Sequence, residues 1–431
     1  MEKKFIRNIF DYFNNSSINY CVLRNYINLP DDFGNDIDIL VKKSDLNFIT
    51  KSLKIIANSN NIQILKIVNK YGYRGLYFFD QLSNKIILID LFYRLQKRWN
   101  VYVNAENILN NKILYRNIYV ISPEYELYSI ALKEILTYGL VRSKYQKRFN
   151  KLKFDIYKFK KISNELLTRE SSKILYNLFL EKKVFNKTNI KLKLKNQNFF
   201  QFIKGFFFYV TFYFFNKINN LFGPSPIITF IGPDGVGKST FSNALSKSCL
   251  NSNFYENARI FHHRFELIPS LNSLLMKNKA SNLIAKSNLN NSNTVHSFSR
   301  TLLYLIYYSI DFILGWGIVL KSKLRNEIII FDRYYFDFFI QNSYSLLPNF
   351  IKKFFYYFIP KPNITFFIYV NPYVAVKRKN ELTINEHIEQ NKQCLYILRN
   401  LAKKRVFINC TGSTDENINY IFNKFMINYI K

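Results

Sequence analysis

The feature that most constrains the fold is a short apolar run that leads directly into a glycine-rich loop. Residues 227–231 read Ile-Ile-Thr-Phe-Ile, the pattern of a buried strand, and residues 232–240 read Gly-Pro-Asp-Gly-Val-Gly-Lys-Ser-Thr. The loop satisfies the spacing GxxxxGK[ST] in the strand-to-helix setting that this motif requires. Glycines let successive backbone N–H groups turn toward phosphate oxygens, and the following helix presents its positive end to the same anion. The predicted phosphate-binding residues are Gly232, Asp234, Gly235, Val236, Gly237, Lys238, Ser239 and Thr240.

Two side chains of this loop predict the ligands that it binds. Lys238 is placed to reach the β- and γ-phosphates of ATP, and the hydroxyl of Ser239 is placed to ligate Mg²⁺. A second magnesium ligand is expected where a neighbouring apolar strand ends, and the run at 328–331, Ile-Ile-Ile-Phe, leads directly to Asp332. We therefore predict ATP and Mg²⁺ as cofactors, with Lys238 and Asp332 in catalytic roles.

From residue 226 onward the chain alternates apolar runs with helical stretches, as a parallel α/β sheet requires. We predict an α/β fold with a five-stranded parallel sheet over residues 226–431. The stretch Thr301–Leu320, which Asp311 interrupts, is expected to be a buried helix of this domain, where Asp311 would need a partner. The expected strands are Ile227–Ile231, Arg259–His262, Ile328–Asp332, Ile364–Val370 and Arg405–Asn409.

These motifs resemble the thymidylate kinase group of P-loop kinases. The resemblance rests on the loop Gly-Pro-Asp-Gly-Val-Gly-Lys-Ser-Thr, with an acidic residue inside it, and on the later run Asp332-Arg333-Tyr334. In that family the acidic loop residue and the Asp-Arg-Tyr cluster lie beside the phosphate acceptor. The resemblance therefore implies a P-loop kinase fold and substrate-binding roles for Asp234, Arg333 and Tyr334.

Further arginines lie at positions that suit phosphoryl transfer. Arg300, near the start of the expected 301–320 helix, and Arg333 could hold an acceptor phosphate with their planar forks. Arg378 and Lys379 could form a lid that closes over the transferred group. We assign catalytic roles to Arg333 and Arg378 and a substrate-binding role to Arg300.

A wider set of residues is similar to thymidylate-kinase-like proteins associated with bacterial surface polysaccharides. The likeness covers most of residues 226–425. However, the segments Phe261–Pro269 and Asn278–Asn293 do not reproduce the ordinary pattern for gripping thymine, so the acceptor could be another phosphorylated metabolite. The set comprises His263-Arg264 with Ile268-Pro269, Ser299-Arg300, Asp332-Arg333-Tyr334-Tyr335 with Asp337, Ile359-Pro360 with Pro362, and Arg378-Lys379-Asn380-Glu381-Leu382.

The N-terminal region carries a separate group of carboxylates. Asp36 and Asp38 lie two residues apart on an expected strand, which places both on one face, and Asp90 ends the apolar run 86–89. Three such carboxylates could bind a divalent metal as a second site, in the arrangement used for nucleotidyl transfer. An arrangement of the same carboxylates without a metal remains the alternative.

This constellation resembles the nucleotidyltransferase superfamily across about residues 15–140. That superfamily usually carries a Gly-Ser turn ahead of the carboxylate pair to hold a triphosphate. The corresponding residues 22–26 here read Val-Leu-Arg-Asn-Tyr, so Arg24 could bind phosphate in place of that turn. The resemblance implies a nucleotidyltransferase-like fold, while a second transferase activity stays open.

The pattern of periodicities and breakers predicts four regions. Residues 1–120 form a small α/β domain, which the resemblance above implies to be nucleotidyltransferase-like, and residues 121–180 form a helical extension that begins at a Ser-Pro-Glu start signal. Residues 181–225 form a basic and Phe-rich linker, and residues 226–431 form the P-loop domain. The expected N-terminal strands are Tyr20–Leu23, Asp36–Val41, Ile62–Val68 and Lys85–Phe92.

Composition bounds the partners and the compartment. The 62 Lys and Arg residues against 29 Asp and Glu give a net charge of +33, which favours anionic partners. These basic residues are spread along the chain, so nucleic-acid binding is not favoured and a small-molecule phosphate acceptor is expected. Four scattered cysteines without a CxxC pair fit a reducing cytoplasm, with membrane association through Phe199–Phe215 as a further option. The sequence gives no sign of oligomeric state.

We therefore expect a Mg²⁺-dependent ATP phosphotransferase that phosphorylates a nucleotide or another phosphorylated small molecule, in surface polysaccharide metabolism if the wider resemblance holds. One alternative is an authentic thymidylate kinase. The other is an ATP-binding regulatory or assembly protein at the membrane surface, without kinase activity.

Overall fold

A computed structural model describes most of the chain and divides it into two compact units, Met1–Asn216 and Lys217–Lys431. Each unit is treated by itself below. Of the sequence features singled out above, Asn278–Asn293 and the lid residues 379–381 lie outside the described residues. The described residues are 2–34, 36–98, 100–143, 145, 152–180, 191–194, 199–252, 254–270, 297–378, 382–410 and 413–430.

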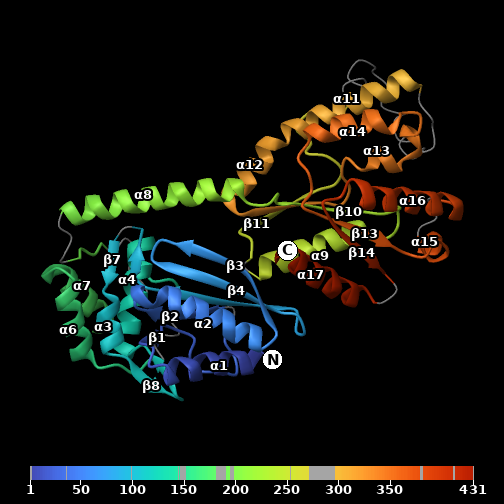
Figure 1. Cartoon of the computed structure of the whole chain (residues 1–431). Helices are drawn as coiled ribbons and strands as arrows, with labels where there is room; N and C mark the ends of the chain where they lie inside the picture. The colour runs from blue at the N-terminus through green and yellow to red at the C-terminus, as the bar shows by residue number, and fades with distance from the viewer. Residues whose placement is uncertain are drawn as a thin grey trace. The chain divides into compact units, whose positions relative to one another are not determined.

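The first unit is built on a mixed seven-stranded sheet in the order β3-β4-β5-β2-β1-β9-β8 (Figure 1). Strands β2 and β5 have the predicted bounds, whereas β4 was not predicted. The sheet strands are β1 (Tyr20–Val22), β2 (Asp36–Val41), β3 (Ile62–Lys70), β4 (Tyr73–Asp80), β5 (Lys85–Phe92), β8 (Ile113–Tyr115) and β9 (Ile118–Val120), and a separate hairpin joins β6 (Leu95–Lys97) to β7 (Asn100–Val103).

Helices of the first unit bury one apolar face each. In α1 (Glu2–Asn15) the buried residues recur at helical spacing and pack into the same core as the inward side chains of α2 (Leu46–Ser59). The predicted helical extension begins at α4 (Pro123–Tyr138), with proline in the first turn, and this helix ends at Gly139 in a left-handed conformation. The remaining helices are α3 (Ala105–Asn110), α6 (Ile156–Leu166) and α7 (Arg169–Leu180).

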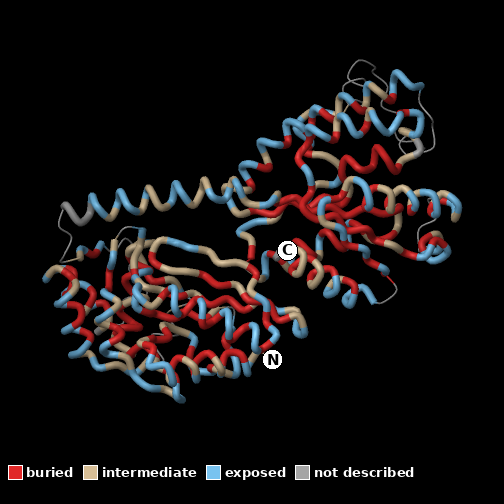
Figure 2. The backbone as a smooth tube through the Cα atoms, viewed as in Figure 1, coloured by how far each residue is buried: buried red, intermediate tan, exposed pale blue. Residues whose placement is uncertain are grey.

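Helix α8 (Phe199–Phe222) occupies much of the segment that the sequence indicates as a linker. Within the first unit, the rings of Tyr209 and Phe212 contact Tyr71, which lies in the turn between β3 and β4, at centroid distances of 5.8 and 5.7 Å. Other aromatic side chains of α8 face solvent, including Phe207 and Phe214, which are 65% and 61% exposed (Figure 2). The helix is therefore apolar around most of its circumference but packed along a narrow strip.

The second unit contains a five-stranded, all-parallel sheet in the order β11-β12-β10-β13-β14, and this confirms the predicted α/β class. Strand β10 lies at the centre and is buried throughout, as its unbroken apolar sequence predicts (Figure 2). Each strand lies within two residues of its predicted bounds. The strands are β10 (Ile227–Ile231), β11 (Asn257–Phe261), β12 (Glu327–Phe331), β13 (Ile364–Tyr369) and β14 (Lys404–Asn409).

Helices connect and cover these strands (Figure 1). They are α9 (Lys238–Asn251), α11 (Phe298–Leu314), α12 (Trp316–Arg325), α13 (Asp337–Ile340), α14 (Asn349–Phe358), α15 (Pro372–Arg378), α16 (Ile384–Asn400) and α17 (Thr414–Ile430). Because every connection between parallel strands is a crossover, the carboxyl ends of all five strands meet at one edge of the sheet.

The expectation of a fully buried helix at 301–320 needs correction. The segment forms α11 and α12, which meet at Gly315, and Leu303 and Leu314 are 59% and 51% exposed. By length and composition, Phe298–Arg325 could cross a membrane, and in the described residues it alone meets that criterion, with 33% of its most apolar window buried. Only part of the segment is buried, because α12 packs against β12 and α11 packs against α14.

Candidate active site at the glycine-rich loop

The loop after β10 can be formed only with glycine at two of its positions. A Cβ atom at Gly232 would lie 2.7 Å from the carbonyl oxygen of Ile368, and the φ of Gly232 is +155°. Gly237 has φ +94° and packs against the ring of Phe241, which a Cβ would approach to 3.2 Å. Gly235 also has a positive φ, +86°. These backbone conformations produce the turn that precedes α9.

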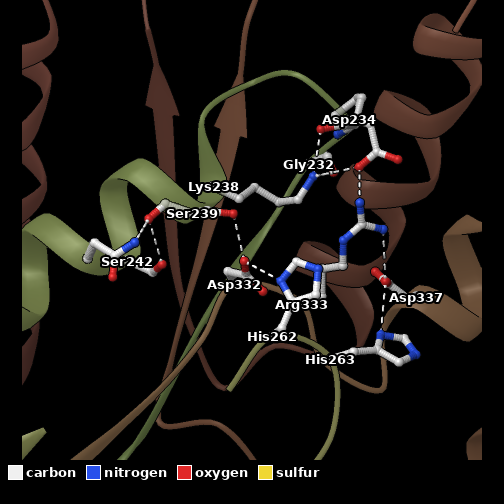
Figure 3. A network of polar contacts seen from close by, with 12 residues as sticks. Gly232, Asp234, Lys238, Ser239, Ser242, His262, His263, Asp332, Arg333 and Asp337 are labelled. Atoms are coloured by element: carbon white, nitrogen blue, oxygen red, sulfur yellow. Dashed lines mark hydrogen bonds and ion pairs between the residues drawn. The ribbon is translucent and has the colours of Figure 1, made fainter. Parts of the chain in front are cut away.

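Lys238 is buried beneath this loop and is bonded to it. Its ammonium donates to the carbonyl oxygens of Gly232 and Pro233 at 2.8 and 2.7 Å and to the Asp234 carboxylate at 3.2 Å (Figure 3). Burial lowers the pKa of Lys238, and the charge of Asp234 partly opposes that change. The ammonium is thus held at the phosphate loop by groups with which a phosphate would compete.

Ser239 and Asp332 meet as the sequence predicts for a magnesium site. The Ser239 hydroxyl donates to Oδ2 of Asp332 at 2.7 Å, and Nδ1 of His262 lies 2.6 Å from the same oxygen (Figure 3). Asp332 follows β12, which pairs with β10, so both ligands lie at the carboxyl edge of neighbouring strands. Its other oxygen, Oδ1, is buried and has no hydrogen-bond partner. A hydroxyl beside a carboxylate with an unpaired oxygen fits the oxygen donors that Mg²⁺ prefers.

Arg333 connects two carboxylates on the opposite side of the loop. It pairs with Asp234, and its Nη1 atom lies 3.4 Å from Oδ2 of Asp337 at the start of α13 (Figure 3). Burial opposes the charge of Arg333, but Asp337 and Asp234 outweigh it, so the pKa lies above the usual value. Its Nε atom is buried and has no partner, which leaves a donor free for a ligand.

Asp337 is ionised although it is buried. Burial alone would raise its pKa, but a hydrogen bond and the charge of His263, together with Arg333, lower the pKa to about 2. Nδ1 of His263 lies 3.3 Å from Oδ2 of Asp337. The carboxylate therefore fixes the guanidinium of Arg333 at neutral pH.

Three predicted residues are not brought into this cluster. Tyr334 is fully buried, and its hydroxyl donates to the carbonyl oxygen of Pro360, in the core and not at the loop. Arg300 lies exposed in the first turn of α11, where its guanidinium is 5.8 Å from the ring centre of Tyr304. Arg378 ends α15, and its side chain lies outside the described residues. The roles assigned to these three residues stay predictions.

The structure also shows the hydrogen-bond partners of the buried Asp311 carboxylate. Its two carboxylate oxygens accept hydrogen bonds from the backbone N–H groups of Glu266, Leu267 and Ile268, at 2.7 to 3.1 Å, and Arg264 lies 3.4 Å away. Asp311 therefore fixes the loop that follows β11, which carries His262 and His263 at its start. The sequence does not predict these hydrogen bonds, because Asp311 lies more than 40 residues from its backbone partners.

Two further polar side chains belong near the cluster and were missed. His387 and Asn391 lie on the buried face of α16, four residues apart. Burial lowers the pKa of His387, and the charges of Asp234 and Lys238 also act on it. A capping signal, Thr-x-x-Glu at residues 383–386, marks the start of α16 in the sequence and could have located them.

The carboxylates of the first unit also come together. Oxygen atoms of Asp36, Asp38 and Asp90 lie within 4.8 Å of one another, and the parallel register of β2 and β5 places Asp38 directly beside Asp90. Gly75 on β4 leaves the space for this arrangement, because a Cβ there would lie 2.9 Å from Oδ1 of Asp90. Arg24 pairs with Asp38 and, at 3.5 Å, with Asp36.

The crowding of these carboxylates changes their ionisation. Burial and the charges of Asp38 and Asp36 raise the pKa of Asp90 to about 7. Burial and the charge of Asp38 also raise the pKa of Asp36, against the effect of Arg24. Both pKa values stay raised although Lys70 acts on Asp90 and Lys133 acts on Asp36 in addition to Arg24, so the group favours a proton or a further cation.

The geometry of the second unit defines a class of protein. A glycine-rich loop between a central parallel strand and a helix, a buried lysine, and a Ser-Asp pair at the strand edge constitute the site of P-loop phosphotransferases. The Asp234–Arg333–Asp337 group places a cation beside that loop, where a second anionic substrate could bind.

Comparison with known proteins agrees with that class. Residues 230–419 match the family model of thymidylate kinase. Among solved structures, a crystal structure of thymidylate kinase from Ehrlichia chaffeensis is similar, with 19% sequence identity, a TM-score of 0.30, and coverage of 47% of this chain and 96% of that chain. No curated protein matches the chain. The family match supports a nucleotide kinase-like ATP phosphotransferase in the second unit.

Proposed function

We propose that the second unit transfers the γ-phosphate of ATP to a phosphorylated small molecule in the presence of Mg²⁺. The observation that carries this proposal is the convergence of Lys238, the Ser239–Asp332 pair and Arg333 around one glycine-rich loop. The match of residues 230–419 to thymidylate kinase supports the same reaction class. Such a reaction depends mainly on positioning and charge stabilisation, and these residues supply both.

Each group has a distinct task. Lys238 and the backbone N–H groups of the loop stabilise the negative charge that builds on the transferred phosphoryl group. Ser239 and Asp332 would hold the Mg²⁺ ion, which neutralises phosphate charge when it is bound. Arg333 would bind the acceptor phosphate, because Asp234 and Asp337 fix its guanidinium in the protein. Arg378 would close over the reacting groups.

The acceptor is proposed to be a nucleotide or another phosphorylated metabolite, including one used to build a surface polysaccharide. Support for a departure from thymidylate comes from the loop after β11, where Asp311 and Arg264 hold residues 264–268 in a fixed conformation. This segment lacks the ordinary pattern for gripping thymine. Authentic thymidylate kinase activity remains the competing proposal.

A transfer screen tests these proposals together. Purified full-length protein is incubated with Mg²⁺, labelled ATP and a panel of nucleoside monophosphates and sugar phosphates. Rapid transfer to thymidylate alone would favour the ordinary kinase, and transfer to a sugar phosphate would favour the polysaccharide proposal. ATP binding without transfer to any acceptor would favour a regulatory protein and overturn the kinase proposal.

The first unit is proposed to bind a divalent cation at Asp36, Asp38 and Asp90. The proposal rests on the 4.8 Å cluster of their oxygens and on the shortage of positive charge there. Isothermal titration of the full-length protein with Mn²⁺ should lose one binding event in the Asp38→Asn variant, while phosphoryl transfer is preserved. If the native chain and the variant titrate alike, the cluster is a carboxylate group without a metal, and Arg24 and protons neutralise it.

We also propose a cytoplasmic protein that contacts a membrane surface through α8. Support comes from the exposed aromatic side chains at 206–208 and 213–215 beside Lys204. Vesicles of anionic phospholipid should co-sediment the native chain more strongly than the Phe207→Ser/Phe214→Ser double variant. Ile55→Ser, which removes a 69% exposed apolar residue from α2, is the matched control. Equal sedimentation of all three proteins would dismiss the membrane contact.

A further inference from the structure

The start of α16 is fixed by interactions that set which face of the helix is buried. The Thr383 hydroxyl accepts a hydrogen bond from the backbone N–H of Glu386 at 3.3 Å, and the Glu386 carboxylate accepts one from the backbone N–H of Thr383 at 2.7 Å. This reciprocal cap begins the helix at Ile384. His387 and Asn391, four residues apart, consequently share the inward face.

Both side chains are buried with unused hydrogen-bonding capacity. His387 is 1% exposed, and neither of its ring nitrogens has a hydrogen-bond partner. Asn391 is 7% exposed, and its Oδ1 atom likewise has none. A buried polar group without a partner destabilises a fold, so packing alone gives no reason for histidine and asparagine at these positions.

The helix that carries them packs against elements that surround the site. Helix α16 packs against α13, the short helix that begins at Asp337 and follows Arg333. The charges of Asp234 and Lys238 reach His387, and those of Lys238 and Asp337 reach Cys394, two turns further along the face. Arg333, whose buried Nε atom has no hydrogen-bond partner, lies four residues before the start of α13.

The chemistry of these groups restricts what can satisfy them. Burial lowers the pKa of His387, so its imidazole is neutral at pH 7 and offers one donor and one acceptor. The free Oδ1 atom of Asn391 accepts only. A ligand that satisfies both side chains must therefore donate at least one hydrogen bond, from a hydroxyl or an N–H group.

We propose that His387 and Asn391 bind the phosphate acceptor and select one whose carbon skeleton carries a hydroxyl or N–H group. This inference rests on the proposed kinase function and adds a specificity element to it. In this arrangement Arg333 binds the acceptor phosphate, and α16 binds the non-phosphate part. A phosphomonoester with a purely apolar skeleton would leave the buried groups unpaired and would be rejected.

Substitution by leucine separates this role from a structural one. His387→Leu removes two unpaired buried nitrogens, so the ligand-free protein should melt at the same or a higher temperature. If His387 binds the acceptor, the variant should raise the KM for the acceptor identified by the transfer screen at least tenfold, with the KM for ATP unchanged. His387→Gln, which keeps a donor and an acceptor, should recover part of that loss.

Ile397→Val, on the same buried face of α16, is the matched control for packing changes. Acceptor and ATP constants equal to those of the native chain are expected for it. If His387→Leu and Asn391→Leu both keep native acceptor constants while the native chain transfers phosphate, the inference is overturned and the proposed function stands.

A binding experiment keeps the inference testable even without turnover. The chain has four histidines, so imidazole resonances of ¹⁵N-histidine-labelled protein can be assigned with the His387→Leu variant. We expect the His387 signals to move when thymidylate or glucose 1-phosphate is added to the Mg·ADP complex. Signals that move with neither acceptor would overturn the inference. Absence of Mg·ADP binding to the native chain would instead refute the proposed function.

Discussion

Each unit of this protein contains a guanidinium that joins two carboxylates, but the surroundings of the two centres differ. Arg24 joins Asp36 and Asp38 on a single strand, and a third carboxylate lies beside them without a further basic partner at salt-bridge distance among the described residues. Arg333 joins Asp234 and Asp337 from separate elements, beside a buried lysine and a glycine loop. In the first centre the carboxylates outnumber the arginine that pairs with them. In the second centre an arginine and a lysine accompany the carboxylates, and the glycine-rich loop adds backbone N–H groups.

That difference teaches which ligand each centre suits. Crowded carboxylates with one cation raise one another's pKa and favour a proton or a metal ion. A glycine-rich loop with positive φ angles can turn its backbone N–H groups toward one anion. With a lysine beneath it, such a loop favours a phosphate. Under the two proposals, the same pairing of arginine with two aspartates therefore serves a cation site in one unit and a phosphate site in the other, and the predictions below separate them.

The largest effect is expected from Lys238→Ala in the second centre. Removal of the ammonium should lower phosphoryl transfer by about 10²-fold to 10³-fold, because that charge faces the developing negative charge on the phosphate. Lys247→Ala, an exposed lysine on the same helix, should leave the rate unchanged. Near-normal turnover of Lys238→Ala, measured with the acceptor from the screen, would remove the kinase assignment.

Asp332→Asn should have a smaller effect that depends on the metal. The amide keeps the shape but loses the charge beside Ser239, so the Mg²⁺ concentration needed for half-maximal activity should rise at least about tenfold. The comparison predicts that Asp38→Asn in the first unit leaves this concentration unchanged. A Mg²⁺ requirement that shifts in Asp38→Asn and not in Asp332→Asn would reverse the assignment of the two centres.

The first centre predicts a dependence of stability on pH. Asp90 keeps its proton in the folded chain up to about pH 7, whereas an aspartate in the unfolded chain loses it near pH 4. Because its folded pKa is raised, the free energy of unfolding should fall as pH rises from about 4 to 7. Asp90→Asn should flatten that fall.

Urea unfolding at several pH values provides the measurement. The chain has two tryptophans, and in a Trp316→Phe background Trp99 reports on the first unit by fluorescence. Added Mn²⁺ should restore stability at pH 7 if the cluster binds metal. An identical pH profile for the native chain and Asp90→Asn would contradict the raised pKa.

The smallest effect is expected from a pair of matched glycine substitutions. Gly232→Ala places a Cβ against the backbone oxygen of Ile368 at a positive φ, so the loop must shift and nucleotide binding should weaken. Gly75→Ala meets only the Asp90 carboxylate, which can rotate away, so the fold should persist with weaker Mn²⁺ binding. Isothermal titration with Mg·ATP and with Mn²⁺ checks both. Comparable losses of binding in both variants would show that the two glycine positions are equally sensitive to an added Cβ, against this comparison.

Local patterns predicted the centre of each unit better than its periphery. Strands β2, β5 and β10 have the expected bounds, because β10 is an apolar run between Pro226 and Gly232, and β2 and β5 combine apolar residues with aspartates at fixed spacing. Strand β4 was missed since Gly75 and Arg74 interrupt its apolar alternation, although that glycine gives Asp90 its space. Helix α8 was not predicted, because its sequence is rich in phenylalanine and tyrosine, whose intrinsic propensities favour strands over helices.

The candidate sites show the same division. The loop motif located Lys238, Ser239 and Asp332 because their relation is encoded in short segments and strand order. The pairing of Arg24 with the carboxylate cluster and the three backbone partners of Asp311 could not be inferred, since they depend on contacts between distant elements. The capping signal at residues 383–386 marks the start of α16, but the burial of His387 without a hydrogen-bond partner could not be inferred, because it depends on the fold.

Transfer of the labelled γ-phosphate of ATP by the full-length protein tests the central claim most directly. With Mg²⁺ and a panel of phosphomonoesters, we predict that label enters at least one acceptor at a rate that depends on Lys238 and Arg333. Release of label to water alone, or transfer that survives in both Lys238→Ala and Arg333→Ala, would contradict the account.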